Sequence, residues 1–389
     1  MYKVVIASDS FKGSLSSAEV AEAAAAGIRS IFPTCKTIQL TIADGGEGTA
    51  LAVAEAGGGN AETVTVHDPL GRLIQSEYYI MKDGTAVMEM AAASGLTLLA
   101  TSERNPLLTS TYGTGEMILD AFAKGCRRFI IGIGGSATND GGTGMLEALG
   151  FRFMDICGRD IKGLCGGRTA EVARIDDSEV PKQLLESEFI VACDVTAPFC
   201  GPGGAADVYA SQKGARTQEM ITTLEAGMES LNEVIKATYG INLKDLPGSG
   251  AAGGLGGAFV ACLKGRLERG IDLVLDTIGF ESIIKDADLI ITGEGKIDNQ
   301  TSQGKVVSGI VSRAKASGVP VIAIAGISEL TESQIQESGL TGVFPIGPRP
   351  QNESDLANAM RPEVASKRIS ETVAKALEEL SPSLFRGNL

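Results

Sequence analysis

The chain has 389 residues, 43% hydrophobic and 21% charged, which is ordinary for a globular protein and long enough for two domains. A formal charge of −14 argues against binding of a nucleic-acid backbone, which requires clustered lysine and arginine. Neither a membrane-spanning run nor a signal peptide is present, so we expect a cytoplasmic protein. Seven cysteines without a CxxC pair argue against a disulfide scaffold or a zinc ribbon, and a single histidine excludes a two-histidine metal site.

The first part of the chain alternates between strand-like and helix-like segments. Val4–Ala7 is a short apolar run that predicts a buried strand, and Ile38–Ile42 predicts a second one. Between them, Ser16 and Glu19 form the S-x-x-E pattern of a capping box, which predicts the start of a helix. Another helix is expected to end at the glycines of 57–59. This alternation favours a parallel α/β sheet.

The pattern changes near residue 62. The segments TVTVHD, LIQSEYYI and TAVMEM alternate between apolar and polar residues, which is typical of strands with one buried face. Asp83 and Gly84 form a hairpin turn signal between the last two segments. Farther along, we expect a helix over 116–123, a strand over 128–133 and a long amphipathic helix over 217–239. This central part therefore predicts mixed or antiparallel β-structure with helices.

From Asp288 onward the first alternation returns. The expected elements are a strand at LIIT, a helix over 306–317, a strand at VIAIA, a short strand over 343–345 and a closing helix over 364–380. We therefore predict an α/β domain with a parallel sheet, built from residues 1–62 and 285–389. A mixed α+β domain, residues 63–284, would be inserted into it.

Four predicted strands are followed directly by an acidic residue. VVIA is followed by Ser8-Asp9-Ser10, IQLTIA by Asp44, FIVAC by Asp194, and LIIT by Gly293-Glu294. Ligands of open α/β sheets bind beyond the carboxyl ends of the strands, so these carboxylates are candidates for binding or catalysis. The alternative for each one is a structural turn residue that hydrogen-bonds its own backbone.

Four lysines adjoin glycines in polar loops: Lys12, Lys213, Lys296 and Lys305. A lysine beside a flexible glycine loop can reach a phosphate that the backbone also approaches, whereas the alternative is a solvated surface side chain. Carboxylates that hold Mg²⁺, lysines that neutralise phosphate and glycine loops that offer N–H groups are the parts of phosphoryl transfer. These lysines would also concentrate positive charge at one site of an acidic protein.

A glycine-rich loop follows the strand expected over 128–133. Residues 132–137 fit the G-x-G-x-x-A fingerprint of a dinucleotide site, with Asp155 farther on, which leaves a nicotinamide-dependent oxidoreductase as an alternative function. The glycines within 141–144 would each destabilise an immediate helix by about 1 kcal/mol. We therefore expect the helix to begin near residue 144 and the loop to form a phosphate-binding nest. A non-catalytic protein that binds a small anion is a third alternative.

Taken together, these motifs resemble the bacterial glycerate kinases, a two-domain family distinct from the P-loop kinases. The motifs that carry the resemblance are SDSFKGSLS at 8–16, ADGGEGT at 43–49, DPLGR at 68–72, GTGE at 113–116, GIGGSATNDGG at 132–142, CDV at 193–195, QKGA at 212–215, GAAGGLG at 250–256 and ITGEGKID at 291–298. They occur in order over nearly the whole chain, so the resemblance covers both predicted domains.

The resemblance implies a kinase that uses ATP and Mg²⁺ to phosphorylate D-glycerate, with 2-phosphoglycerate as the favoured product. It also implies that the domain made from both chain ends is Rossmann- or flavodoxin-like. Nucleic acid and membrane are not expected as partners, and a homodimer is compatible with the sequence. The sequence itself does not decide which hydroxyl of glycerate is phosphorylated.

The resemblance also assigns candidate residues to each part of the site. The catalytic candidates are Asp194, Asp44 and Lys12, and the sequence leaves open which carboxylate is the base and which holds metal. The substrate-binding candidates are Asp9, Ser10, Lys12, Gly45, Gly46, Glu47 and Arg72. The candidates for nucleotide or phosphate binding are Gly134, Gly135, Ser136, Thr138, Asn139, Asp140, Gly141, Gly142, Lys296 and Lys305. The metal candidates are Asp194, Glu294 and Asp298.

Overall fold

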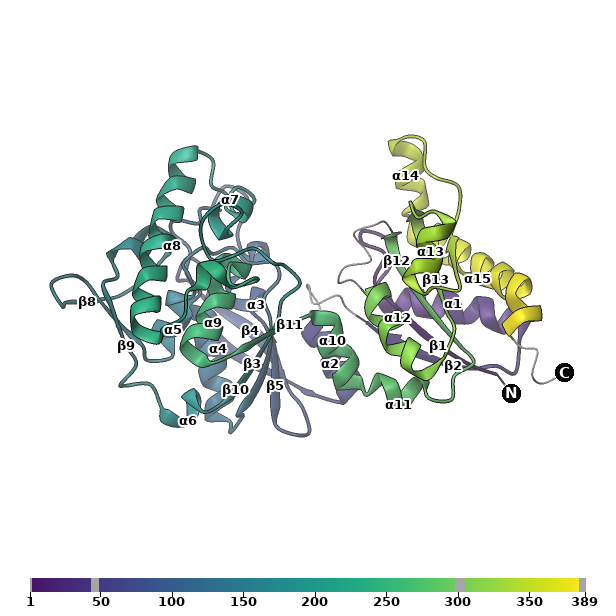
Figure 1. The fold of residues 1–389 in the computed structure, drawn as a ribbon, viewed down its shortest axis with the longest axis horizontal. Coiled ribbons are helices and arrows are strands. Elements are labelled where there is room, and N and C mark those ends of the chain that lie inside the picture. The colour runs from purple at the N-terminus through teal and green to yellow at the C-terminus, as the bar shows by residue number, and fades with distance from the viewer. Residues whose placement is uncertain (1, 43–48, 298–305, 385–389) are drawn as a thin grey trace. The chain divides into compact units, whose positions relative to one another are not determined.

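A computed structural model describes residues 2–42, 49–297 and 306–384, and its internal contacts divide the chain into two compact units (Figure 1). The first unit comprises Met1–Asp44 and Ile271–Leu389, and the second comprises Gly45–Gly270. The first unit is thus built from both ends of the chain, and the second is inserted into it. The domain boundaries predicted from the sequence, between residues 62 and 63 and between residues 284 and 285, stay a prediction.

The first unit contains a parallel sheet, with the strand order β14-β13-β12-β1-β2 among the residues described. Its strands are β1 (Lys3–Ser8), β2 (Lys36–Thr41), β12 (Leu289–Ile297), β13 (Val321–Ser328) and β14 (Gly342–Pro345). Its helices are α1 (Ser17–Ile31), α10 (Gly270–Ile278), α11 (Phe280–Ile284), α12 (Val306–Ser317), α13 (Glu332–Ser338), α14 (Glu353–Ala359) and α15 (Pro362–Leu384). The expected α/β alternation at both chain ends is confirmed.

Helices cover both faces of this sheet, which explains why its strands read as continuous apolar runs. On one face, α1 and α15 lie side by side over Val4, Ile6 and the matching residues of β12 and β13 (Figure 1). Gly27 of α1 allows this close packing, because a Cβ there would lie 2.4 Å from the carbonyl oxygen of Ser370. Ser16 and Glu19 form the predicted capping box at the start of α1.

Helices α10, α11 and α12 of the first unit are joined by one arginine. Arg313 of α12 forms ion pairs with Asp272 and Asp276 of α10 and with Glu281 of α11. Its pKa lies above the ordinary arginine value, because Asp276 and Glu281 both accept hydrogen bonds from it. The segment 271–284, which the sequence placed with the inserted domain, is therefore tied to the first unit.

The second unit is a mixed α/β structure. The strands of its main sheet are β3 (Asn60–His67), β4 (Leu73–Ile80), β5 (Thr85–Glu89), β6 (Arg128–Gly132), β10 (Glu188–Ala192) and β11 (Arg266–Glu268). A smaller antiparallel sheet contains β7 (Arg152–Met154), β8 (Asp160–Ile161) and β9 (Arg174–Asp176). The α-helices are α2 (Thr49–Gly57), α3 (Ala91–Ser94), α4 (Tyr112–Ala123), α5 (Thr143–Ala148), α6 (Lys182–Leu185), α7 (Ala205–Tyr209), α8 (Gln218–Tyr239) and α9 (Leu255–Leu263). Short 3₁₀ helices lie at Leu96–Leu98, Gly166–Glu171, Leu243–Asp245 and Ala251–Gly254.

The main sheet of the second unit combines parallel and antiparallel pairing, as the sequence predicts. Strands β11, β10, β6 and β5 are parallel, whereas β4 and β3 are antiparallel to their neighbours. The predicted hairpin joins β4 to β5, where Gly84 has φ of +82° and Asp83 accepts the N–H of Thr85. Phe129 of β6 stacks on Phe189 of β10, and Phe259 of α9 packs against Phe189 at a tilt, in an apolar core that extends to α4, α5, α8 and α9.

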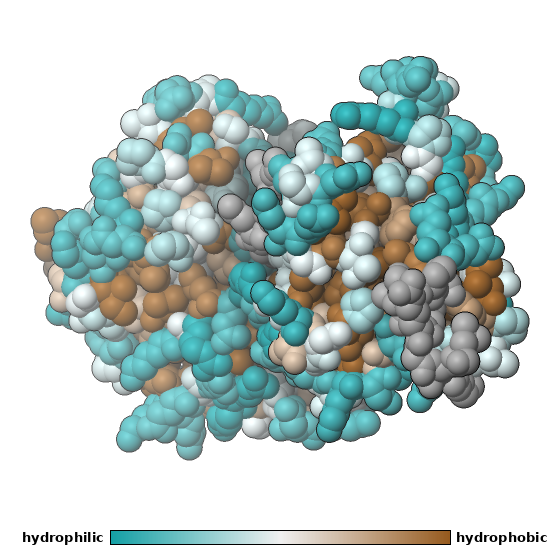
Figure 2. Space-filling model, turned by 45° about the vertical axis from the view of Figure 1, so that its right-hand side comes forward, coloured by the Kyte–Doolittle hydropathy of each residue, from teal (hydrophilic) through white to brown (hydrophobic). Residues whose placement is uncertain are grey.

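The surface is largely hydrophilic on the face drawn in Figure 2, with apolar patches between charged side chains. Within the part of the chain that is described, no helix is both long enough and apolar enough to cross a membrane.

Candidate functional site

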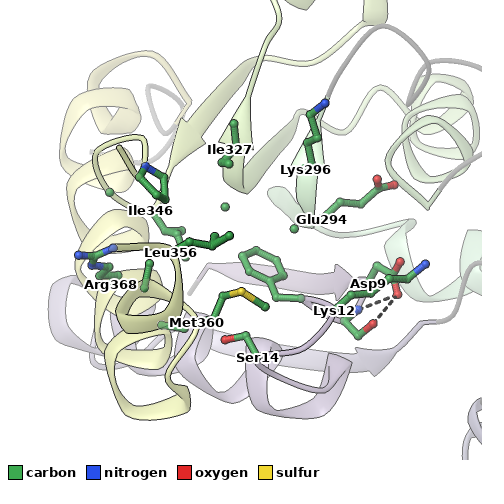
Figure 3. Close-up of a pocket in the computed structure, with 18 of the residues that line it drawn as sticks. Asp9, Lys12, Ser14, Glu294, Lys296, Ile327, Ile346, Leu356, Met360 and Arg368 are labelled. Atoms are coloured by element: carbon green, nitrogen blue, oxygen red, sulfur yellow. Dashed lines mark hydrogen bonds between the residues drawn. The ribbon is translucent and has the colours of Figure 1, made fainter. Parts of the chain in front are cut away.

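A cavity of about 360 Å³ lies at the carboxyl edge of the first unit's parallel sheet (Figure 3). It is lined by the segments that follow β1 and β14, by the last residues of β12 and β13, and by residues of α14 and α15. In the sheet order, β1 and β12 are neighbours, and the chain proceeds from them toward opposite edges of the sheet. Open α/β sheets bind ligands at this kind of reversal point, so the position of the cavity marks it as a candidate site.

Five of the predicted site residues line this cavity: Asp9, Ser10, Lys12, Glu294 and Lys296. They come from two segments about 280 positions apart in sequence, which the parallel pairing of β1 with β12 brings to one edge. Figure 3 shows the labelled charged side chains Asp9, Lys12, Glu294 and Lys296 gathered at one end of the cavity. Asp9 follows β1 as predicted, whereas Glu294 lies within β12, which continues to Ile297 instead of ending at LIIT.

The loop after β1 is held in shape by local hydrogen bonds. The N–H of Asp9 donates to the carbonyl of Gly293 at 3.0 Å, which ties the loop to β12. Asp9 is 8% exposed, and its Oδ1 accepts the N–H of Ser10 at 2.7 Å. Lys12 is exposed beyond this turn. The segment thus presents a fixed carboxylate and a solvent-exposed ammonium group to the same cavity.

The charged residues of β12 have partners in the same unit. Glu294 is buried, and its Oε1 faces the N–H of Val307 at 3.4 Å, in the first turn of α12. The N-terminus of a helix favours a negative charge, so this position suits an ionised carboxylate. Lys296 is half exposed and pairs with Glu329 at 3.0 Å, so an anionic ligand would compete with that ion pair.

The other end of the cavity is apolar and was not predicted. Phe11, Ile327, Ile346, Leu356 and Met360 contribute to the lining. Figure 3 shows the last three on the side opposite the labelled charged groups, with Arg368 of α15 farther out. Leu356 belongs to α14, a seven-residue helix whose polar sequence carries little apolar periodicity. The sequence signal was therefore too weak to find this wall.

Several predicted residues lie outside the described part of the chain. They are Asp44, Gly45, Gly46, Glu47, Asp298 and Lys305. Their roles stay predictions.

The glycine-rich loop of the second unit connects β6 to α5, and the carboxylate of Asp140 organises it. Oδ2 of Asp140 accepts the N–H and the hydroxyl of Thr111, both at 2.8 Å, and the N–H of Gly144 at 3.2 Å. Oδ1 accepts the N–H of Gly142 at 3.1 Å. Burial raises the pKa of Asp140 above its usual value, and these donors oppose that shift. The carboxylate of Asp140 therefore stabilises the loop through hydrogen bonds within the protein.

The last glycines of the loop are needed for packing. A Cβ at Gly141 would lie 2.4 Å from Cδ2 of Leu231, and one at Gly142 would lie 2.4 Å from Cβ of Ala258. The N–H of Gly141 already donates to the carbonyl of Gly253 at 2.9 Å. The backbone at Gly141 and Gly142 thus packs on α8 and α9, and both amides make hydrogen bonds within the protein.

The middle of the loop has polar side chains with unused hydrogen-bonding capacity. In the part of the structure that is described, Ser136 Oγ, Thr138 Oγ1 and both side-chain polar atoms of Asn139 are buried without a hydrogen-bond partner. Thr138 and Asn139 are fully buried, and Ser136 is 6% exposed. Because buried polar groups are nearly always paired in proteins, these atoms are candidates for contact with a polar ligand.

A buried lysine supports this loop from within. Nζ of Lys213 donates to the carbonyl of Thr138 at 2.7 Å, and the residue is 3% exposed. Burial lowers the pKa of Lys213 to about 7, although the nearby Asp140 acts in the opposite direction. The sequence pointed to Lys213 through its glycine neighbour but did not place it among the site residues, because the contact joins positions 75 apart.

Asp194 and Arg72 also lie in the second unit. Asp194 is exposed after β10, where its Oδ1 accepts the N–H of Gly270 at 3.0 Å. Arg72 donates to Asp68 at 2.5 Å and to Glu103 at 2.7 Å, and Asp68 raises its pKa above the ordinary arginine value. A substrate carboxylate would have to compete with both of these partners for Arg72.

Comparison with known proteins identifies the family. A model of the glycerate kinase family matches residues 4–378. The chain belongs to the glycerate kinase family. A glycerate kinase of Bacillus subtilis is 46% identical over 89% of this chain and 90% of its own length. A glycerate 2-kinase of Escherichia coli is 44% identical over 88% of this chain and 90% of its own length. The crystal structure of a candidate glycerate kinase 2 from Salmonella typhimurium LT2 matches with a TM-score of 0.84 and 42% identity, over 98% of both chains.

No finding on this glycerate kinase family member supports the oxidoreductase alternative. A dinucleotide fingerprint requires a helix that opens directly at the glycines, but α5 begins at Thr143. Asp155, the expected ribose ligand, accepts the N–H groups of Cys157 and Arg159 in its own turn. The expectation that the helix begins near residue 144 is confirmed.

The described residues of this family member contain no cluster of three acidic, histidine or cysteine side chains that could hold a metal ion. Of the three predicted metal ligands, Asp194 lies in the second unit, Glu294 in the first, and Asp298 outside the described residues. Mg²⁺ is commonly bound through one or two carboxylates together with substrate phosphates. Asp9 and Glu294, which share the cavity of the first unit, fit that smaller requirement.

Proposed function

We propose that this protein catalyses the ATP-dependent phosphorylation of D-glycerate to 2-phosphoglycerate. The observation that carries the proposal is the match to the glycerate kinase family over residues 4–378. The cavity of the first unit supports it, because lysines and carboxylates converge there at the carboxyl edge of a parallel sheet. The Escherichia coli relative named glycerate 2-kinase favours transfer to the 2-hydroxyl.

In this proposal, the charged end of the cavity binds the phosphates. Phosphoryl transfer passes through a loose transition state whose charge spreads over the phosphoryl oxygens, so catalysis depends mainly on position and on neutralisation of charge. Lys12 is exposed and able to reorient toward phosphate. Lys296 can give up its ion pair with Glu329 and bind phosphate instead. Lys12 is the catalytic candidate on this side, because its side chain is exposed and lines the charged end of the cavity.

A carboxylate accepts the proton of the attacking hydroxyl. Asp194 and Asp44 are the proposed candidates, and the choice between them stays open. Asp194 is exposed and uses one oxygen for the N–H of Gly270, so it suits an ionised base. A loose transition state requires only weak basicity from this group, so an ordinary aspartate is sufficient.

In the second unit, we assign ligand binding to the middle of the loop and structure to its end. Ser136, Thr138 and Asn139 provide unused donors and acceptors that match an oxygen-rich anion. Gly134 and Gly135 stay candidates for backbone contact. Asp140, Gly141 and Gly142 hold the loop in place, so their proposed contribution to phosphate binding is indirect.

Mg²⁺ is a proposed cofactor. Asp9 and Glu294 offer the oxygen ligands that this ion prefers, and the remaining ligands would come from phosphate and water. When bound, Mg²⁺ would neutralise charge on the phosphates. Asp194 and Asp298 stay predicted ligands.

An assay of glycerate-dependent ADP release tests the proposed function. The full-length protein is given ATP and Mg²⁺ with D-glycerate, tartronate or other small hydroxy acids, and NMR locates the phosphate on the product. We expect turnover with D-glycerate and a phosphate on C2. Reduction of a nicotinamide nucleotide without ADP release would contradict the proposal, and a phosphate on C3 would contradict its regiochemistry.

A further inference from the structure

The cavity of the first unit has two ends of different chemistry. Asp9, Lys12, Glu294 and Lys296 form the charged end, and Phe11, Ile327, Ile346, Leu356 and Met360 contribute apolar surface. Figure 3 shows Ile346, Leu356 and Met360 across the cavity from these four charged side chains, on the side where Arg368 lies farther out. A ligand that fills this whole space would therefore place a sizeable apolar group at one end and charged or polar groups at the other.

A three-carbon hydroxy acid does not have this form. Every carbon of glycerate carries an oxygen, so none of its surface matches an apolar wall, and its burial there would leave polar groups without partners. The volume of about 360 Å³ is within the range of cavities that bind drug-sized ligands. The apolar end therefore has no role in binding glycerate.

Two features of the apolar wall indicate that it is completed by a ligand. Leu356 is 43% exposed although it lines a cavity, and exposed apolar surface rimmed by polar groups is characteristic of binding sites. Met360, one residue beyond α14, has a flexible side chain that adapts to flat ligands. The nearby Pro348 and Pro350 add rigid apolar surface.

We propose that this apolar end binds the base and sugar of the nucleoside triphosphate, with the phosphates at the end formed by Lys12 and Lys296. The proposal rests on the proposed kinase function and adds the location of the nucleoside. It agrees with the position of the cavity at the reversal point of a parallel sheet, where such sheets bind nucleotides. It also gives α14, which the sequence did not predict, a role in recognition of the phosphoryl donor.

Comparison of two ligands, ATP and inorganic tripolyphosphate, distinguishes the contribution of the nucleoside to binding from that of the phosphates. Binding of ATP and of inorganic tripolyphosphate to the full-length protein is measured by calorimetry for wild type, Leu356→Ser and the control Ile156→Ser. Ile156 is 92% exposed in the second unit and lines neither the cavity nor the loop. We expect Leu356→Ser to lower the affinity for ATP about 10-fold, because the base loses apolar contact. The affinity for tripolyphosphate should change less than about twofold. Equal effects on both ligands, or none on ATP, would overturn the proposal.

A second variant reports on the cavity directly. The chain contains no tryptophan, so Leu356→Trp introduces a single tryptophan, which can be excited selectively, into the apolar wall. We expect ATP to shift or quench its emission, whereas D-glycerate leaves it unchanged, and Ile156→Trp responds to neither. A response to D-glycerate instead of ATP would assign the cavity to the acceptor and overturn the proposal.

The two proposals fail separately. If ATP binds as described but D-glycerate causes no ADP release, the kinase function is contradicted and the nucleoside site stands. If wild type phosphorylates D-glycerate while Leu356→Ser keeps wild-type affinity for ATP, the nucleoside site is contradicted and the function stands.

Discussion

The two units use their conspicuous motifs in opposite ways. In the first unit, SDSFKGS and ITGEGK meet at the edge of a parallel sheet and place charged side chains in an open cavity. In the second unit, GIGGSATNDGG folds into a dense loop whose last glycines pack against α8 and α9 and whose aspartate is fully buried. Similar-looking glycine-rich motifs therefore use glycine for different purposes. In GIGGSATNDGG, the last two glycines are required for close packing.

This difference predicts different consequences of substitution. Changes at the charged end of the first unit's cavity should lower activity and leave the fold intact. Changes at the end of the second unit's loop should lower the free energy of unfolding.

The largest expected effect concerns the buried carboxylate of the second unit. Asp140→Asn places an amide N–H₂ among four donors and leaves Lys213 without its compensating charge. We expect the free energy of unfolding to fall by about 3–5 kcal/mol, measured by urea denaturation. The control Asp160→Asn, at an exposed ion pair with Arg152, should cost at most about 1 kcal/mol. Equal effects of the two variants would show that the loop does not depend on its internal carboxylate.

Next in size is the loss of a positive charge from the first unit's cavity. Lys12→Met should reduce kcat by about 10²–10³-fold, because in the proposed mechanism Lys12 neutralises charge on the transferring phosphoryl. Urea denaturation should give the wild-type transition, since Lys12 is exposed. Lys315→Met, at an exposed position on α12 in the same unit, serves as the control and should keep wild-type turnover. A Lys12→Met protein with normal turnover would remove Lys12 from the site.

A smaller effect separates packing from backbone strain in the loop. Gly142 and Gly158 have φ of +75° and +76°, but a Cβ at Gly142 would lie 2.4 Å from Ala258, whereas one at Gly158 has no atom within 4 Å. Gly158→Ala should lower the free energy of unfolding by only about 1–2 kcal/mol, the strain of a side chain in the left-handed backbone conformation. Gly142→Ala should cost about 1–3 kcal/mol more in overpacking. Matching losses in urea denaturation would exclude packing as the reason for Gly142.

The last expected effect, the most gradual, is a pH dependence from Lys213. Its pKa of about 7 in the folded protein is below the ordinary value of 10.5, so between these pH values the unfolded chain holds a proton that the folded chain has released. Wild type should therefore gain stability relative to Lys213→Met as the pH rises from about 7 to 10, by at most about 1.4 kcal/mol per pH unit. Below pH 7 the difference should stay constant. If the plots of unfolding free energy against pH were parallel for wild type and Lys213→Met over the whole pH range, Lys213 would remain charged in the folded protein.

The sequence predicted the parts of the fold that depend on local pattern. Apolar runs bounded by turn residues located β1, β12 and β13, and alternation located β3 and β4. Ser16 and Glu19 marked the start of α1, and the apolar stripe of 217–239 marked α8 to within one residue at its start. The sequence placed Glu294 after a strand, but β12 continues through it to Ile297, and the parallel pairing of β1 with β12 brings Glu294 and Asp9 to one edge.

By itself, then, the sequence determined the elements, their alternation and the family, since these depend on neighbours in the chain and on motifs read in order. Only the tertiary structure decided how these groups are used: Gly142 packs against Ala258, Lys213 donates a hydrogen bond to Thr138, and Leu356 lines the same cavity as Phe11. Each of these pairs joins residues far apart in sequence. Burial and hydrogen bonding between such residues arise from packing of the whole unit, and no local pattern encodes them.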